Sequence, residues 1–588
     1  MSTRSRPARN AGGRPRRAPR RADGPHQRRY GAAGRLGTLA YGVVSGLLAG
    51  AVALGVAELI SGITGPQGGP VVAVGGAAID MTPIPVKDFA IAHFGSHDKT
   101  ALITGILVLL AVFAAVIGVL ALRWLAAGLA GLAVFGVLGI SAALTRPTGG
   151  ATDVLPTLAG VAVAAVVLVV LVRTATTRWR GAVPADTAPT DTAPAETGAA
   201  DAWAKDSGVA AAAVTPSSAT AREVRPGKTL VVGHWRRRRF LAVSATAAVI
   251  AAAGGGIGDL LLRRFNVTAS RAQVRLPAAA QKAAAVPAGT ELQIGGISSF
   301  YTPNSSFYRV DTDLVVPQVS PDQWTLKIGG MVGQPVELSF ADLLRQPLTE
   351  ADITIVCVSN EVGGPYAGNA RWLGVSLPAL LRRAGIRRGA DQVLSTSVDG
   401  MTISTPVSAI MDGRNALLAV GMNGQPLPVE HGFPARMIVP GLYGYTSATK
   451  WVTSLEVTTF ARQQAYWTQR GYAQQAPIKT ESRIDVPKPL TRVAAGRVPV
   501  AGVAWAPQRG ISAVEVSVDN GPWRPARLAA ADGIDTWRQW VWDWDATPGL
   551  HQLQARATDG TGATQTDRRT GVFPSGATGW DSVVVTVT

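Results

Sequence analysis

The sequence predicts a multi-domain protein with an all-α transmembrane region, an α+β domain and an all-β C-terminal domain. Five apolar segments long enough to cross a bilayer lie within the first 262 residues. Beyond them the apolar runs give way to alternating β-branched residues, Pro, Gly and Trp. At 588 residues the chain is also too long for a single hydrophobic core.

A basic tail opens the chain: residues 1–36 hold eleven Arg and one Asp, in a protein of net charge +18. Such a tail binds nucleic acid or forms the cytoplasmic flank of a membrane span. Because an apolar span follows at once, we favour the flank, with a cytoplasmic N-terminus and no nucleic-acid partner.

Four transmembrane helices are predicted within residues 37–173, at 37–63, 101–122, 125–144 and 154–172. Residues 70–95 are also fairly apolar, but Asp80, Pro83 and Lys87 interrupt them, and we predict an interfacial loop. Residues 174–235 are rich in Ala, Pro and Thr, which predicts a disordered cytoplasmic linker without a core.

The segment 236–262 joins four arginines at 236–239 to a fifth predicted transmembrane helix. Arginines that flank a span stay in the cytoplasm, so this crossing places everything after residue 263 outside it. The run Arg237-Arg238-Arg239-Phe240-Leu241 resembles a twin-arginine export signal, a route for folded proteins that carry a cofactor. It is similar to the last helix of actinobacterial membrane proteins that use this route. We therefore predict a multi-pass plasma-membrane protein.

A linker at 263–291 is predicted to lead into two soluble domains. Within 292–478, WTLKIGGMV and PVELSF indicate strands, while FADLLRQ and LPALLRRAGI indicate short helices, which is typical of an α+β domain. Within 479–588, segments such as VAGVAWA, WRQWVWDW and SVVVTVT alternate with period two and indicate an immunoglobulin-like sandwich. Asp519-Asn520-Gly521 predicts a hairpin turn. Trp540, Trp542 and Trp544 predict packing or a subunit interface.

Cys357 is the only cysteine of the chain and lies in the β-branched run ITIVCVSNE. A single cysteine excludes a disulfide framework, thiolate zinc sites and four-cysteine iron–sulfur clusters. By residue type alone it is an inert core thiol, a nucleophile or a metal ligand. A lone thiolate binds a soft metal when a cofactor supplies the other ligands.

The stretches TIVCVSNE, GNARWLGVSLPALLRRAGI and MNGQPLPVEHGFPARMIVPGLYGYTSATKW resemble the molybdopterin domain of the sulfite oxidase family. Upstream, YTPNSSFYRVDTDLVVP is similar to the first cofactor-binding stretch of that family. The C-terminal GATGWDSVVVTV is similar to its dimerisation domain. The resemblance covers residues 292–588 and implies a Mo-molybdopterin cofactor and a homodimer.

The resemblance implies that Cys357 is the catalytic residue and the metal ligand, giving its thiolate to molybdenum. It implies cofactor-binding roles for Tyr308, Arg309, Asp311, Thr312, Asp399, His431, Arg436, Ala448, Thr449 and Lys450. Among them, Arg436 and Lys450 carry the charge that a phosphate attracts. Tyr443 and Tyr445 either line the same cleft or pack beside neighbouring glycines.

Three departures from the family pattern bear on the substrate. The pocket arginine of the family aligns with Val310, although Arg309 lies beside it. The two arginines that follow CxxN are Glu361 and Val362, and the tyrosine before MNG is Val420. Fewer cations and donors weaken anion binding, and an ionised Glu361 near the pocket would repel sulfite. We therefore expect a small neutral substrate, such as a sulfoxide.

The sequence as a whole predicts a membrane-anchored, molybdopterin-dependent oxidoreductase that catalyses two-electron oxygen-atom transfer outside the cytoplasm. Two alternatives stay open: sulfite oxidation, and a non-catalytic membrane-anchored binding protein that kept the fold. The sequence contains no haem or cluster motif. We therefore expect electrons to pass to or from a separate carrier, a quinone or a redox protein.

Overall fold

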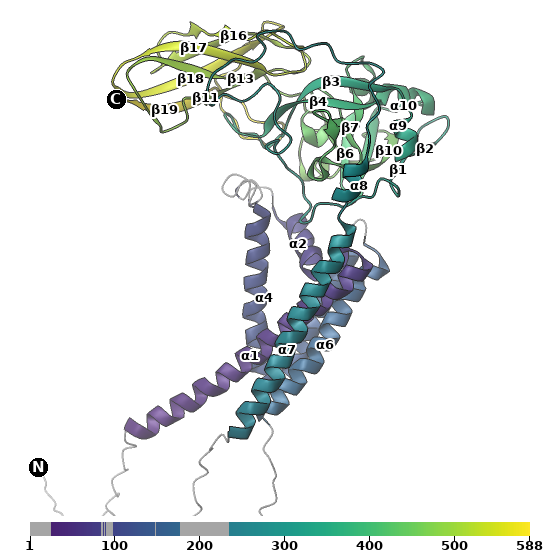
Figure 1. Cartoon of the computed structure of the whole chain (residues 1–588), viewed down its shortest axis with the longest axis vertical. Helices are drawn as coiled ribbons and strands as arrows, with labels where there is room; N and C mark the ends of the chain where they lie inside the picture. The colour runs from purple at the N-terminus through teal and green to yellow at the C-terminus, as the bar shows by residue number, and fades with distance from the viewer. Residues whose placement is uncertain (1–24, 84–85, 87–88, 90–97, 147–148, 177–233) are drawn as a thin grey trace, which may run out of the picture.

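Figure 1 shows the computed structural model of the protein, which describes residues 25–83, 86, 89, 98–146, 149–176 and 234–588. A bundle of long helices carries two β-rich units at one of its ends (Figure 1). The basic tail up to residue 24 and residues 177–233 of the linker predicted at 174–235 lie outside the described residues.

The helical region contains α1 (Pro25–Thr64), α2 (Pro70–Met81), α4 (Asp98–Arg123), α5 (Leu125–Leu144), α6 (Leu155–Thr176) and α7 (His234–Leu262), with short 3-10 turns η1 (Pro66–Gly68), η3 (Ala151–Val154) and η4 (Arg263–Phe265). Among the described residues, five helices are long and apolar enough to cross a membrane, and they match the five predicted spans. Residues 70–81, predicted as part of a loop, instead form α2. Pro70 starts this helix with a fixed φ, and its 12 residues are too few to cross a bilayer.

The central helix of the bundle is α1, which packs against α4, α6 and α7. Small residues let these backbones approach closely. A β-carbon on Gly46 would lie 1.9 Å from the carbonyl oxygen of Ala114 in α4, and one on Gly55 would lie 2.4 Å from that of Ala251 in α7. Larger side chains there would force the helices apart, so the helices form one packed unit.

The α+β unit is built on two sheets with a shared core. One sheet has the order β2 (Val336–Ser339), β1 (Thr325–Gly330), β10 (Val452–Thr458), β5 (Gln392–Ser397), β6 (Thr402–Pro406). The other has the order β3 (Leu348–Val356), β4 (Ala367–Ser376), β7 (Leu417–Met422), β8 (Gln425–Pro426), and β9 (Arg436–Ile438) pairs with β7. Only the β1–β10 pair is parallel within these two sheets. Leu326 and Leu455 of one sheet pack with Val375 and Leu418 of the other.

Short helices and turns connect these strands, as the sequence predicts for this region. They are α9 (Phe340–Leu344), α10 (Leu377–Ala384), α11 (Val407–Met411), and the 3-10 turns η5 (Val429–His431), η6 (Gly444–Thr446) and η7 (Thr468–Arg470). Ser339 caps α9 by accepting a hydrogen bond from the backbone N–H of Asp342. Gly385, in the left-handed region, ends α10.

The C-terminal unit consists of two sheets that face each other. One has the order β11 (Glu481–Val486), β13 (Gly496–Trp505), β17 (Arg538–Ala546), β16 (Arg527–Leu528), and the other β12 (Arg492–Val493), β19 (Asp581–Val587), β18 (Gly549–Asp559), β14 (Ile511–Val518), β15 (Arg524–Pro525). Trp540 and Trp544 lie in the core between the sheets, which confirms the packing interpretation for both. The predicted hairpin turn is also confirmed: Asp519 and Asn520 have positive φ, and β14 pairs with β15.

The chain between α7 and the α+β unit lies against that unit. Val267 is buried in its core, and α8 (Thr268–Gln273) follows. Arg271 of α8 donates hydrogen bonds to the carbonyl oxygens of Leu427 (2.6 Å) and Pro426 (2.6 Å). The segment predicted as a linker therefore fixes the α+β unit to the end of the helical bundle.

Candidate active site

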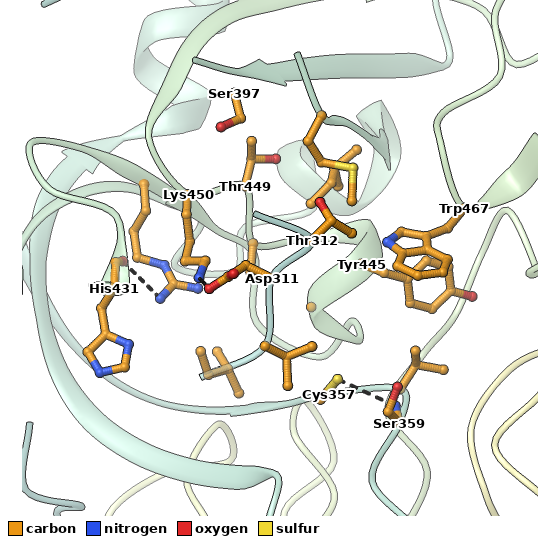
Figure 2. A pocket seen from close by; sticks show the side chains of 18 of the residues that line it. Asp311, Thr312, Cys357, Ser359, Ser397, His431, Tyr445, Thr449, Lys450 and Trp467 are labelled. Atoms are coloured by element: carbon orange, nitrogen blue, oxygen red, sulfur yellow. Dashed lines mark hydrogen bonds and ion pairs between the residues drawn. The ribbon is translucent and has the colours of Figure 1, made fainter. Parts of the chain in front are cut away.

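A pocket of about 130 Å³ lies in the α+β unit, and residues at the ends of β3, β5 and β9 line it. Figure 2 shows side chains of its wall. All the predicted site residues line it except Arg309: they are Tyr308, Asp311, Thr312, Cys357, Asp399, His431, Arg436, Ala448, Thr449 and Lys450. They come from four separate stretches between residues 308 and 450, so the fold gathers the residues that the sequence motifs indicated.

Cys357 follows the last residue of β3, and its side chain lines the pocket. A tight turn holds it there. Its backbone N–H donates to the carbonyl oxygen of Tyr366 (2.9 Å), and the Asn360 side chain accepts from the N–H of Tyr366 (2.8 Å). The N–H of Ser359 donates to Sγ of Cys357 (3.4 Å). Burial raises the pKa of the Cys357 thiol, so a cation is needed to favour the thiolate.

Arg436, the first residue of β9, is a buried cation that is 4% exposed. Its Nη1 donates to the carbonyl oxygen of His431 (3.2 Å), and its guanidinium lies 5.2 Å from the centre of the Trp372 ring. Burial lowers its pKa to about 10, which still leaves it charged at neutral pH. Within the described residues it has no ion pair, and its Nε has no hydrogen-bond partner. An unpaired buried charge is costly, so this position favours an anionic ligand.

His431 lies beside Arg436 at the same side of the pocket. Its Nε2 is 3.3 Å from the carbonyl oxygen of Asn304. Burial and then the positive charge of Arg436 lower its pKa to about 3. The imidazole is therefore neutral at physiological pH and can exchange hydrogen bonds without adding charge.

Asp311 lies at the centre of a cationic network. Lys450 Nζ is 2.8 Å from its Oδ2, Arg309 Nε is 2.8 Å from the same oxygen, and Lys99 of α4 is also ion-paired with it. Burial opposes ionisation, but the charges of Lys450, Arg309 and Lys99 outweigh it and hold the pKa of Asp311 well below its usual range. Burial lowers the pKa of Lys450 to about 8. Arg309 thus supports the pocket through Asp311 without lining it.

Hydroxyl and backbone groups close the side of the pocket formed by the turn before β10. Thr449 Oγ1 shares a hydrogen bond with Ser395 Oγ, and its carbonyl oxygen accepts from the N–H of Met437 (2.8 Å). Ser397 Oγ is buried on the wall, and no hydrogen-bond partner for it lies in the part of the chain that the structure describes. Unpaired polar atoms at Ser397 and Arg436 fit a ligand that is rich in hydrogen-bonding groups, as a pterin with a phosphate is.

The structure corrects part of the argument about the substrate. Val310 lies on the pocket wall, as the alignment with the family indicated. Glu361 is exposed and does not line the pocket, so the expected repulsion of an anion by its carboxylate is wrong. Val362 packs with Val572 instead of lining this pocket, and Val420 lies in the core of the α+β unit. Of these departures, only Val310 changes the wall.

The aromatic residues of the wall were predicted only in part. Of the two tyrosines for which the sequence left both alternatives open, Tyr445 lines the pocket, whereas Tyr443 is buried and does not line it. Other wall residues were not identified from the sequence. Trp467 and Tyr472 extend the aromatic wall, and Tyr445 and Tyr472 have ring centres 5.4 Å apart. Lys99, which binds Asp311 from the helical region, had no sequence signal because it is 212 residues away along the chain.

Comparisons with known proteins agree with this geometry. Residues 313–467 match the family described as oxidoreductase molybdopterin binding domain. Rat mitochondrial sulfite oxidase is 31% identical over 291 residues, which cover 42% of this chain and 52% of the relative. The uncharacterized oxidoreductase YuiH of Bacillus subtilis is 33% identical over 150 residues, which cover 26% of this chain and 72% of YuiH. The sulfane dehydrogenase SoxCD of Paracoccus pantotrophus is 25% identical, with a TM-score of 0.43 over 50% of this chain and 88% of that chain.

The family match and the similarity to YuiH, together with the pocket, define a molybdopterin-binding oxidoreductase. The chain belongs to the sulfite oxidase-like family of these proteins, whose cofactor is molybdopterin with molybdenum. The chain spans about half the length of the sulfite oxidases that it matches. The half-buried thiol of Cys357, the unpaired Arg436 and the hydroxyl of Ser397 fit this cofactor.

Proposed function

We propose that the protein transfers an oxygen atom to or from a small neutral substrate, such as a sulfoxide, at a molybdopterin cofactor. The observation that carries this proposal is the division of the pocket. His431 and Lys450 lie on one side, the aromatic Tyr445 and Trp467 lie on the other, and Cys357 lies below the space between them (Figure 2). One side suits an anionic cofactor, and the other suits an uncharged substrate.

The cationic side would hold the cofactor. Arg436 would pair with the phosphate, with Lys450 and the Thr449 turn beside it, and the thiolate of Cys357 would bind the metal. When bound, the cofactor supplies molybdenum, which carries two electrons and one oxygen atom per turnover. Because burial raises the pKa of Cys357, the thiol gives up its proton only as the metal binds, so loading releases a proton.

The aromatic side would select the substrate. Tyr445 and Trp467 line it, Val310 and Val358 also line the pocket, and none of these four side chains carries a charge. Burial raises the pKa of Tyr308 well above its usual range, and the nearby Cys357 adds to this. Tyr308 therefore keeps its proton and can donate a hydrogen bond to the oxygen of a sulfoxide. An anion such as sulfite would lose its hydration there without meeting a cation.

Metal and pterin analysis of the full-length protein tests the cofactor, and a turnover screen tests the substrate. Protein made in a molybdate-supplied host should contain close to one molybdenum and one pterin per chain. With artificial electron carriers, sulfoxides should turn over faster than sulfite. Absence of both molybdenum and pterin would instead favour a non-catalytic binding protein that kept the fold.

Sulfite is the second candidate substrate, because several relatives are named sulfite oxidase. Arg436, whose charge has no ion pair among the described residues, would favour sulfite if the cofactor phosphate did not cover its guanidinium. A sulfite rate above every sulfoxide rate would overturn the proposed substrate while keeping the cofactor assignment.

We infer that the α+β unit faces the outside of the cytoplasmic membrane and that the twin-arginine-like run directs its export. Arg237, Arg238 and Arg239 are exposed at the start of α7, at the end away from the α+β unit (Figure 1). An arginine cluster there agrees with a cytoplasmic start of α7. We further propose that the C-terminal sandwich, which we interpret as immunoglobulin-like, serves as the dimerisation surface. A quinone or a redox protein would exchange electrons with the pocket.

A further inference from the structure

A second cavity, of about 400 Å³, lies within the helical region between α1, α2, α4, α5 and α6. Apolar side chains such as Leu54, Leu110, Phe135 and Leu168 line it. Among the described residues on its wall, Thr157 is the only one with a polar side-chain atom. The cavity therefore suits a long apolar chain with one hydrogen-bonding group near Thr157.

The hydroxyl of Thr157 is buried without a partner. Thr157 is 4% exposed, and its Oγ1 has no hydrogen-bond partner among the described residues. A buried hydroxyl that donates no hydrogen bond is unfavourable. A ligand with an acceptor oxygen beside Thr157 would supply the missing partner. Thr157 belongs to the first turn of α6, close to α2 beneath the α+β unit.

The upper end of the cavity lies close to the segment that continues from the wall of the active-site pocket. Val74 of α2 and Ile106 of α4 line the cavity. Next to Val74, a β-carbon on Gly75 would lie 2.3 Å from Leu314 and 3.4 Å from Ile106. Leu314 lies two residues after the stretch 310–312 that lines the cofactor pocket. Helices α2 and α4 thus line the cavity and also contact the segment around residues 310–314.

The cavity is also accessible from the bilayer side of the helices. Among its wall residues, Leu47, Leu107 and Leu138 are 39%, 41% and 57% exposed. Their position on long apolar helices places them among lipid chains. A ligand dissolved in the membrane can therefore enter laterally.

We propose that this cavity binds an isoprenoid quinone, which exchanges electrons with the cofactor pocket. The proposal rests on the proposed function, since oxygen-atom transfer needs a two-electron carrier. A quinone carbonyl would accept a hydrogen bond from Thr157, and the isoprenoid tail would fill the apolar part. When the substrate gains an oxygen atom from water, the water releases two protons, and the quinone takes up two electrons and two protons to become the quinol. Sulfoxide reduction is the reverse reaction. The quinol gives up two electrons and two protons, and the sulfoxide oxygen leaves as water.

The test compares two tryptophan substitutions on α6 of the full-length protein. Val161 is half-buried on the cavity wall, whereas Val166 is 63% exposed and does not line the cavity. Sulfoxide reduction is measured with decylubiquinol and, separately, with reduced methyl viologen. Val161→Trp should lower the ratio of the quinol rate to the viologen rate at least tenfold, and Val166→Trp should leave it unchanged. Thr157→Val should raise the KM for decylubiquinol several-fold.

A binding measurement decides the inference apart from turnover. Decylubiquinone should quench the tryptophan fluorescence of the wild-type protein saturably and should compete with a phospholipid for the cavity. Val161→Trp should abolish saturable binding, assayed by radiolabelled decylubiquinone. Equal binding by wild type and Val161→Trp, or occupancy by phospholipid alone, would overturn the inference. If viologen also fails to support turnover, the proposed function fails, and the binding result still stands on its own.

Discussion

Lys99, at the start of the long apolar helix α4, is ion-paired with Asp311 on the wall of the cofactor pocket. Lys99 also donates to the carbonyl oxygen of Asp313. Asp80, near the end of α2, accepts a hydrogen bond from the hydroxyl of Tyr466 (2.6 Å). Tyr466 directly precedes Trp467, which lines the pocket. The helical region therefore reaches the pocket itself and is part of its support.

Replacing Lys99 with Gln should lower the free energy of unfolding of the α+β unit by about 1–2 kcal/mol, because a charged hydrogen-bond partner is lost at a mostly buried carboxylate. Asp311 keeps Lys450 and Arg309, so the pocket should still fold. Thermal unfolding of the detergent-solubilised protein measures the change. The matched control is Lys327→Gln, since Lys327 and Glu337 form an exposed pair 3.9 Å apart, and it should cost less than about 0.5 kcal/mol. Equal shifts for both variants would contradict the role given to Lys99.

Replacing Cys357 with Ser should lower the ratio of molybdenum to pterin in the protein at least tenfold. The reason is that the thiol would bind the metal, while other residues would hold the pterin. Metal analysis and pterin fluorescence on the same sample give the two contents. Ser359→Ala is the control, because the N–H that contacts Cys357 is kept. Retention of molybdenum in Cys357→Ser would exclude this thiolate as a required ligand.

Replacing Arg436 with Met should lower the pterin content at least tenfold and should leave the cofactor-free protein equally or more stable. The buried guanidinium has no ion pair within the described residues, so its removal relieves a desolvation cost in the absence of the phosphate. Thermal unfolding of protein from a cofactor-deficient host measures the second effect. Arg345, which is exposed, provides the control Arg345→Met. A large loss of stability in the cofactor-free Arg436→Met protein would show that Arg436 serves the fold instead.

Cofactor binding should weaken as the pH rises through 8. Burial lowers the pKa of Lys450 to about 8, so at pH 9 only about one in ten molecules keeps this charge, and a neutral amine does not pair with a phosphate. Cofactor retention should therefore fall up to about tenfold between pH 7 and pH 9. Lys450→Arg keeps its proton across this range and should remove the fall. A pH dependence that persists in Lys450→Arg would assign it to another group.

Replacing Arg237 and Arg238 with Lys should leave the α+β unit on the cytoplasmic side if the twin-arginine route exports it. Protease accessibility in spheroplasts measures the side of the membrane. The variant keeps the positive charge that orients α7, so altered insertion alone does not explain the loss. Unchanged exposure at the outer surface would rule out this route. Arg263→Lys, at the opposite end of α7, is the control.

The sequence predicted the elements and residues that depend on local patterns. Hydropathy over about 20 residues found the five long helices, and ordered motifs found ten of the pocket residues. It did not predict where Glu361 and Val420 point. The turn after Cys357 directs Glu361 to solvent, and β7 is buried on both faces, so no alternation distinguishes Val420. Lys99 was missed because long-range ion pairs depend on how the units pack.

The contacts of Arg271 with the carbonyl oxygens of Pro426 and Leu427 leave the catalytic unit without a free tether. Only a few residues separate the end of α7 from Val267, which is already in the core. The unit therefore cannot swing away from the helical bundle. In the membrane orientation that we propose, it would work at a fixed height with one face toward the lipid headgroups. Substrates would then diffuse to the membrane surface, and a carrier that moves within the bilayer would meet the same face at every encounter.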